Sequence, residues 1–133
     1  MRIRSLELVG FKSFGDRTVF AFDRGISAIV GPNGCGKSNV IDALRWVMGE
    51  HNPRHLRGRD MQDLIFAGTE RKPAVGMCEV ALTLDNSDGL APQPYGAFSE
   101  IQVSRRLYRS GESEYTINKV PVRLRDVLDF FLD

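Results

Sequence analysis

The eight residues GPNGCGKS, at positions 31 to 38, combine three glycines with a lysine and a serine. The spacing of Gly31, four residues and then Gly36-Lys37-Ser38 matches the P-loop pattern, in which successive backbone N–H groups surround phosphates. Glycine lets the backbone approach a phosphate without a Cβ clash. The lysine would reach the β- and γ-phosphates, and the serine hydroxyl would bind Mg²⁺. The stretch therefore predicts a site for ATP and Mg²⁺.

The predicted nucleotide contacts extend over the loop and the residue after it. They are Pro32, Asn33, Gly34, Cys35, Gly36, Lys37, Ser38 and Asn39, with Lys37 also catalytic and Ser38 the metal ligand. Cys35 fills a variable position of the pattern, and its side chain needs no role. The amides of Asn33 and Asn39 would contact phosphate or the attacking water, or make local turn hydrogen bonds instead.

The flanking segments agree with a P-loop. GISAIV, at residues 25–30, is a continuous β-branched run that suits a strand buried on both faces. Apolar side chains at helical spacing then predict a helix from Lys37 to Met48, which Gly49 would end. The competing interpretation is a glycine-rich turn with a surface lysine. We disfavour it because strand, loop and helix follow in the order that the motif requires.

The rest of the chain alternates between strand patterns and turns. We expect a first hairpin over residues 3–22, a loop at 51–60, a short helical turn at 61–68 and a half-buried strand at 74–85, then a flexible connection at about 86–97, a second hairpin over 98–118 and a helix that starts at Pro121. No glycine or asparagine ends that last helix, so we expect the chain to stop short of a natural boundary.

The composition sets further limits. A length of 133 residues suits one domain, and a net charge of +1 means that any nucleic-acid contact needs a local patch. The N-terminus has no apolar stretch long enough for a signal peptide or a membrane span, so we expect a cytoplasmic protein without membrane contact. The two cysteines lack metal-site spacing and are read as free thiols.

Several segments together resemble the N-terminal head segment of bacterial SMC (structural maintenance of chromosomes) proteins. They are GFKSF at 10–14, GPNGCGKSNVIDALRWVMGE at 31–50, LRGRDMQDLIFAG at 56–68, VALTLDN at 80–86 and RRLYRSGESEYTIN at 105–118. The similarity covers nearly the whole chain, and it is far more specific than a P-loop alone.

The resemblance implies an α/β fold. Residues 1–133 would form the N-terminal lobe of an ABC-type ATPase head, a P-loop NTPase with a mixed β-sheet, a P-loop helix and a C-terminal helix, cut before the coiled coil. ATP would be hydrolysed only after the C-terminal lobe and a second head of a homodimer complete the site. The activity would drive DNA organisation in chromosome condensation and segregation at the nucleoid, with kleisin-type accessory subunits.

The same resemblance assigns roles outside the P-loop. Arg57 matches an arginine that reaches the nucleotide phosphates, and a guanidinium facing developing γ-phosphate charge suits a catalytic role. Without the resemblance, a solvated loop arginine would be preferred. Lys12 and Ser13 match the segment near the adenine and ribose. The competing interpretation there is a hairpin turn with a packed Phe14.

Basic side chains predict a second surface. Arg123 and Arg125 match positions where the family contacts duplex DNA, and Arg59 could join them, although Asp60 departs from the pattern. Arg105, Arg106 and Arg109 cluster on the second hairpin and are further candidates. Such contacts would bind DNA without sequence preference. A solvated surface of mixed charge is the alternative.

Asp85 ends an apolar run and imitates the magnesium-binding Walker B aspartate. We reject that role because the run alternates and Asn86 follows. By the resemblance, the genuine Walker B pair and the signature motif lie in the absent C-terminal half. Two further functions stay open: a related long-coiled-coil DNA-repair ATPase, or an isolated lobe that binds DNA or a partner without hydrolysing ATP.

Overall fold

A computed structural model describes residues 1–22 and 34–132 of the chain. Its centre is a sheet of six strands in the order β2-β1-β3-β4-β5-β6, in which each pair of neighbours is antiparallel. The strands are β1 (Arg2–Val9), β2 (Thr18–Ala21), β3 (Met77–Asp85), β4 (Glu100–Tyr108), β5 (Ser113–Ile117) and β6 (Val120–Val122). The helices are α1 (Gly34–Val47) and α2 (Leu124–Leu132), with short 3-10 turns η2 (Pro53–Leu56), η3 (Met61–Leu64) and η4 (Tyr95–Ala97).

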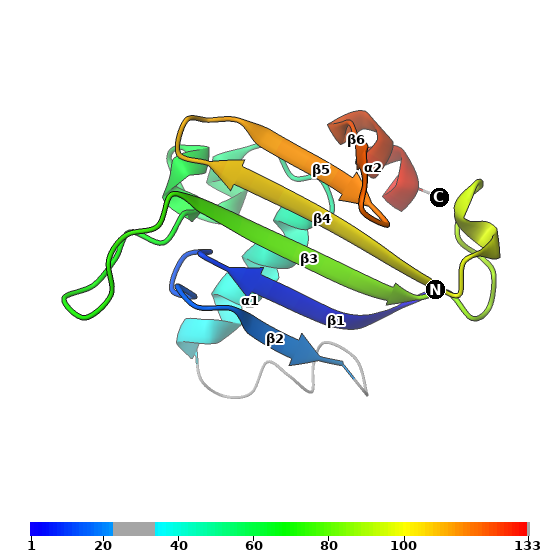
Figure 1. Cartoon of the computed structure of the whole chain (residues 1–133), viewed down its shortest axis with the longest axis horizontal. Helices are drawn as coiled ribbons and strands as arrows, with labels where there is room; N and C mark the ends of the chain where they lie inside the picture. Colours follow the sequence, from blue (N-terminus) through cyan, green and yellow to red (C-terminus); the bar gives the residue numbers. More distant parts are fainter. Residues whose placement is uncertain (23–33, 133) are drawn as a thin grey trace.

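Helix α1 covers one face of the sheet, behind the central strands in Figure 1. The strands alternate in burial as their sequences predict, so that Val80 and Leu82 of β3 face the helix while Glu79 does not. Trp46 is fully buried and packs against Phe11, with 5.6 Å between the ring centroids. This core fixes α1, and with it the end of the P-loop motif, against the sheet.

Both expected hairpins and the expected helix are confirmed. Residues Ser5–Leu8 of β1 pair with β2, and Val103–Leu107 of β4 pair with β5. Helix α1 begins at Gly34 and ends at Val47, and Gly49 follows with a φ of 119°, which favours glycine. The strand expected at residues 25–30 lies outside the described residues.

The helix expected from Pro121 is wrong at its start, because residues Val120–Val122 form strand β6 instead. Asn118 and Lys119, with φ values of 51° and 68°, make the tight turn that pairs β6 with β5. Pro121 is tolerated because β6 is the last strand of the sheet, where one missing donor breaks no ladder. Helix α2 begins only at Leu124.

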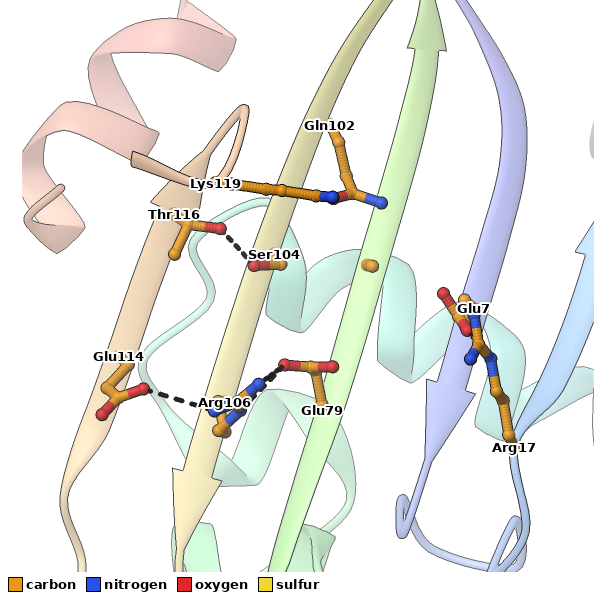
Figure 2. A pocket seen from close by; sticks show the side chains of 10 residues that line it. Glu7, Arg17, Glu79, Gln102, Ser104, Arg106, Glu114, Thr116 and Lys119 are labelled. Atoms are coloured by element: carbon orange, nitrogen blue, oxygen red, sulfur yellow. Dashed lines mark hydrogen bonds and ion pairs between the residues drawn. The ribbon is translucent and has the colours of Figure 1, made fainter. Parts of the chain in front are cut away.

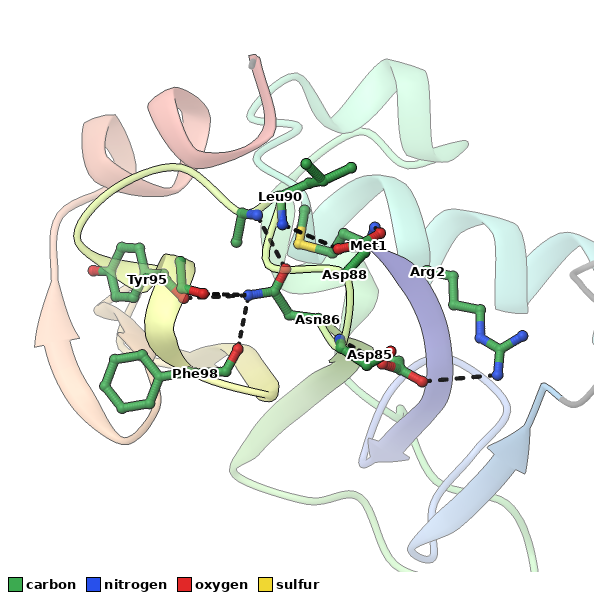
Figure 3. Close-up of polar contacts among 11 residues, drawn as sticks. Met1, Arg2, Asp85, Asn86, Asp88, Leu90, Tyr95 and Phe98 are labelled. Carbon is green, nitrogen blue, oxygen red and sulfur yellow. Dashed lines mark hydrogen bonds and ion pairs between the residues drawn. The ribbon is translucent and has the colours of Figure 1, made fainter.

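The segment at 86–97, expected as a flexible connection, is organised around the buried side chain of Asn86 (Figure 3). Asn86 Nδ2 donates to the carbonyl of Phe98 at 2.7 Å, and Asn86 Oδ1 accepts from Ala91 N at 3.0 Å. Next to it, Asp85 accepts from Ser87 N, which lowers the pKa of the Asp85 carboxyl, and it lies 3.7 Å from Arg2. Both side chains therefore hold a loop in place.

Among the described residues, no helix combines the length and apolar character that crossing a membrane would require.

Candidate functional site

The third turn of α1 carries a buried carboxylate. Asp42 is 2% exposed and follows Ser38 by four residues, so the two share one face of the helix. Asp42 Oδ2 accepts hydrogen bonds from Lys12 Nζ at 2.6 Å and from Arg57 Nε and Nη2 at 2.9 and 2.6 Å. A buried carboxylate is stable only when it is paired and hydrogen-bonded. Two cations meet that need here.

Two loops bring these cations to α1. Lys12 follows β1, and its backbone N–H donates to Leu64 O at 2.6 Å. Arg57 ends η2, and its N–H donates to Arg54 O at 3.3 Å. Both residues have positive φ values, 48° and 59°, a conformation that costs a non-glycine residue on the order of 1 kcal/mol. The contacts with Asp42 help to offset this cost.

The cations differ in exposure. The Lys12 side chain is 13% exposed, and its Nζ also donates to Leu56 O at 2.6 Å. The Arg57 side chain is 54% exposed, and its Nη2 also donates to Asn39 Oδ1 at 2.9 Å. Lys12 is thus enclosed by protein. The guanidinium of Arg57 is bound along one edge, and the rest of it is accessible to solvent.

The amide of Asn39 joins the two loops. Asn39 Nδ2 donates to Ser13 Oγ at 2.8 Å, and its Oδ1 accepts from Arg57. Both partners are distant in sequence, so the described hydrogen bonds of this side chain are long-range contacts and not the local turn contacts considered above. Asn39 therefore ties the loop after β1 to the loop after η2.

The structure thus gathers residues that the sequence analysis assigned to the nucleotide from three separate segments: Lys12, Ser13, Asn39 and Arg57. Ser38 immediately precedes Asn39 on α1 and is half-buried. Gly34, Cys35, Gly36 and Lys37 belong to the first turn of α1 by their backbone, and their side chains lie outside what the structure describes. Pro32 and Asn33 lie wholly outside the described residues.

Asp42 is the member of this cluster that the sequence analysis missed. One signal could have found it, because Asp42 interrupts the apolar run of a helix that is otherwise expected to be largely buried. A carboxylate on such a helix needs a cationic partner. The sequence does not say that Lys12 and Arg57 supply it.

Phe14 packs as the hairpin interpretation predicts. Its ring lies edge-on to Phe20, with 5.7 Å between centroids, and its backbone pairs with Phe11. The packing fixes the turn that carries Lys12 and Ser13. It is compatible with both interpretations of this segment.

The basic cluster expected on the second hairpin needs correction, because Arg105 is not a surface residue. It is 4% exposed and faces α1 from β4. Its guanidinium lies between two rings, 4.7 Å from the centroid of Trp46 and 4.9 Å from that of Tyr115. Its Nη1 donates to Trp46 O at 2.8 Å and to Glu50 O at 2.7 Å. Burial lowers the pKa of Arg105, and Tyr115 opposes that effect.

Arg106 and Arg109 are also engaged by the protein. Arg106 lies in a hollow on the sheet face away from α1, where it pairs with Glu79 at 2.6 Å and with Glu114 at 3.7 Å (Figure 2). Arg109 donates to the carbonyls of Val75 and Phe66 at 2.8 and 3.1 Å. This face has mixed charge, as the alternative interpretation expects.

The other candidate DNA contacts are exposed: Arg59, Arg123 and Arg125. Arg123 lies 3.6 Å from Asp126 at the start of α2. The backbone N–H of Arg59 donates to Asp63, and hydrogen bonds from Asp60 and Arg59 lower the pKa of the Asp63 carboxyl. All three arginines are exposed to solvent, and the Arg123 side chain is 76% exposed.

Comparison with known proteins agrees with the fold and the motif. The profile of the RecF/RecN/SMC N-terminal domain family matches residues 2–133, and the chain therefore belongs to this family. The resemblance noted from the sequence is thereby confirmed, as is the expected fold class.

The relatives are SMC proteins. Chromosome partition protein Smc of Myxococcus xanthus (strain DK1622) is 59% identical over 134 residues, which cover 99% of this chain and 11% of that protein. A structure solved in work on ATP-driven dimerization and DNA-stimulated activation of SMC ATPases has a TM-score of 0.88 at 36% identity, covering 99% of this chain and 78% of that one. The Smc head bound to the C-winged helix domain of ScpA has a TM-score of 0.87 at 33% identity, covering 99% of this chain and 40% of that one.

Proposed function

We propose that this chain is the N-terminal lobe of a chromosome-partition ATPase head and binds ATP at the start of α1. The observation that carries the proposal is the convergence of Lys12, Arg57 and Asn39 on the turn of α1 that directly follows the P-loop motif. Cations and amide groups gathered at this position favour a polyphosphate. The relatives, which are chromosome partition proteins, support the same function.

The first turn of α1 contains no acidic residue, so nothing in it opposes the positive end of the helix dipole. Backbone N–H groups there lack partners within the helix and can donate to phosphate oxygens. Lys37 would add charge at the β- and γ-phosphates. Arg57 would stabilise the charge that develops on the γ-phosphate during hydrolysis, with Lys12 and Ser13 nearer the base and ribose.

Ser38 would be the protein ligand for Mg²⁺. Its hydroxyl is the type of oxygen ligand that Mg²⁺ prefers, and it lies next to the cluster on α1. When bound, Mg²⁺ would neutralise part of the phosphate charge. Among the side chains that the structure describes, those of residues 1–22 and 38–132, no three acidic, histidine or cysteine groups are placed together to hold a metal. The ion would therefore depend on the nucleotide and on groups beyond the described part.

The complete activity would need partners. The chain spans only 11% of the Smc protein of M. xanthus, so hydrolysis, dimerisation through a second head and docking of a kleisin-type subunit are proposed for the longer protein. Duplex DNA would bind through exposed basic residues such as Arg59, Arg123 and Arg125. The proposal places the protein in the cytoplasm, at the nucleoid.

Substitution of Lys37 tests the nucleotide site. We expect Lys37→Ala in the full-length protein to weaken ATP binding by at least about 100-fold, because a charge at the phosphates is lost. Calorimetric titration with a non-hydrolysable ATP analogue and Mg²⁺ measures this. Lys119→Ala, an exposed lysine at the β5–β6 turn, is the matched control and should bind normally. Unchanged affinity in Lys37→Ala would refute the assignment.

A further inference from the structure

The P-loop motif does not account for Asp42. This carboxylate is buried in the interior of α1, away from the capping positions, and its described hydrogen-bond partners are the side chains of Lys12 and Arg57. Burial of a charge is costly unless the charge is paired and hydrogen-bonded, and a residue that pairs two cations at once also fixes their positions.

We propose that Asp42 is a positioning residue that holds the Arg57 guanidinium in place for phosphate chemistry, with Lys12 holding Asp42 in turn. The proposal rests on the nucleotide-binding function proposed above. Asp42 itself would not touch the nucleotide. Its effect on turnover would pass through Arg57.

The hydrogen bonds define the position of the guanidinium. Asp42 Oδ2 engages both Nε and Nη2 of Arg57, which fixes one edge of the planar group. Asn39 Oδ1 takes a second hydrogen bond from Nη2. Arg57 Nη1 makes no hydrogen bond to any described residue, so it is the donor left for an anion.

The carboxylate is itself held firmly. Lys12 Nζ binds both Asp42 Oδ2 and the carbonyl of Leu56, at 2.6 Å each. Leu56 directly precedes Arg57, so one ammonium group connects the α1 carboxylate to the backbone beside the arginine. Without this support an exposed arginine side chain would lose rotamer entropy each time it took up one position for the phosphate.

A purely structural role for Asp42 predicts a different outcome, and a double-mutant cycle separates the two. In the full-length protein, Asp42→Asn should lower kcat about tenfold and leave the Kd for a non-hydrolysable ATP analogue within about threefold. In an Arg57→Ala background, Asp42→Asn should change kcat by less than about twofold, because the group it positions is gone. If the double variant instead lost kcat by the product of the two single-variant factors, the proposal would be overturned.

Two further variants protect this test. Asp42→Glu keeps the charge and moves it by one methylene, so it should lower kcat by a smaller factor, again only when Arg57 is present. If Asp42→Asn fails to fold, this variant decides the outcome. Glu79→Gln is the matched control, since it removes a carboxylate that pairs with Arg106 on the opposite sheet face and should leave kcat unchanged.

A readout without ATP separates this proposal from the proposed function. Phenylglyoxal modifies accessible arginines, and peptide mass spectrometry can follow Arg57 alone. We expect Arg57 in Asp42→Asn to react at least about threefold faster than in the wild type, because its Nε and Nη2 lose the charged carboxylate and keep at most a neutral amide oxygen as acceptor. An unchanged rate would overturn the role of Asp42 even if ATP binds. If the wild type did not turn over ATP but Arg57 was still modified faster in Asp42→Asn, the proposed function would be contradicted and the role of Asp42 would stand.

Discussion

Two parts of helix α1 each hold an arginine, in opposite ways. At the C-terminal end, Arg105 is 4% exposed, lies between Trp46 and Tyr115 and donates to the carbonyl of Trp46 in the helix and to that of Glu50 just beyond it. Toward the middle of the helix, on the side of the P-loop motif, Arg57 is 54% exposed and is held along one edge by Asp42. The arginine near the C-terminal end is thus enclosed by protein, whereas the arginine near the P-loop motif is accessible to solvent.

The difference follows from the helix itself. Carbonyls at a helix C-terminus carry partial negative charge and lack partners within the helix, so a buried guanidinium satisfies them. N–H groups at the N-terminus attract an anion instead. A cationic side chain on that side of the helix can bind the same anion only if part of the side chain stays accessible to it. Arg105 is therefore expected to stabilise the fold, and Arg57 to act on a ligand.

Removal of Arg105 should have the largest effect on stability. Arg105→Ala leaves the carbonyls of Trp46 and Glu50, at and just after the end of α1, without their donor and leaves a gap between two rings, so we expect the free energy for opening of α1 to fall by about 2–4 kcal/mol. Native-state hydrogen exchange of the α1 amides in the full-length protein measures it. Arg45→Ala, an exposed arginine on the same helix, should cost less than about 0.5 kcal/mol. Equal effects of the two changes would contradict the comparison.

Removal of Arg57 should affect turnover and not the stability of α1. We expect Arg57→Ala to lower kcat about 100-fold, because transition-state charge on the γ-phosphate loses its partner, while ATP affinity changes by less than about threefold. Steady-state turnover and analogue titration on the full-length protein give both numbers. If Arg57→Ala lowered the free energy for opening of α1 as much as Arg105→Ala does, the two arginines would have the same structural role and the comparison would fail.

Exposed arginines without a buried partner form a third class. The double substitution Arg123→Ala and Arg125→Ala should weaken binding of duplex DNA and make its dependence on salt shallower by about two ions. Binding to one duplex at several salt concentrations tests this. Arg106→Ala, which removes an arginine already paired with Glu79, is the control. An unchanged salt slope in the double variant would remove these residues from the proposed DNA surface.

Alkylation of the buried thiol of Cys78 reports on whether a variant loosens the core, and we expect only a small change in its rate. Burial raises the pKa of this thiol on β3 to about 12, so only about one molecule in ten thousand carries a thiolate at pH 8. Because the thiolate reacts, alkylation in the folded wild type should be slow and should rise with pH. We expect peptide mass spectrometry to find the same slow rate in Arg57→Ala and a faster one in Arg105→Ala. Rapid alkylation in the wild type would contradict the burial.

Much of this structure could be predicted from local patterns. Apolar side chains at helical spacing predicted helix α1, and alternation predicted both hairpins. The helix expected from Pro121 was wrong because the apolar run there serves two elements, and the turn at Asn118 and Lys119 lacks the glycine that usually marks a hairpin.

The site could be predicted only in part, because its geometry depends on contacts between distant segments. Arg105 alternates in phase with Ile101 and Val103, so the pattern of β4 already placed it on the inner face. Nothing in that pattern says that the carbonyls of α1 lie opposite. Asp42 likewise needed the positions of Lys12 and Arg57, which reach it from loops 30 and 15 residues away.

Hydrogen–deuterium exchange on the full-length protein, with and without a non-hydrolysable ATP analogue and Mg²⁺, tests the central claim most directly. N–H groups of the first turns of α1 should become protected because phosphate accepts from them, as should the loops that carry Lys12 and Arg57, while the C-terminal end near Arg105 stays unchanged. Protection elsewhere in the protein, with residues 34–42 exchanging as before, would contradict the account.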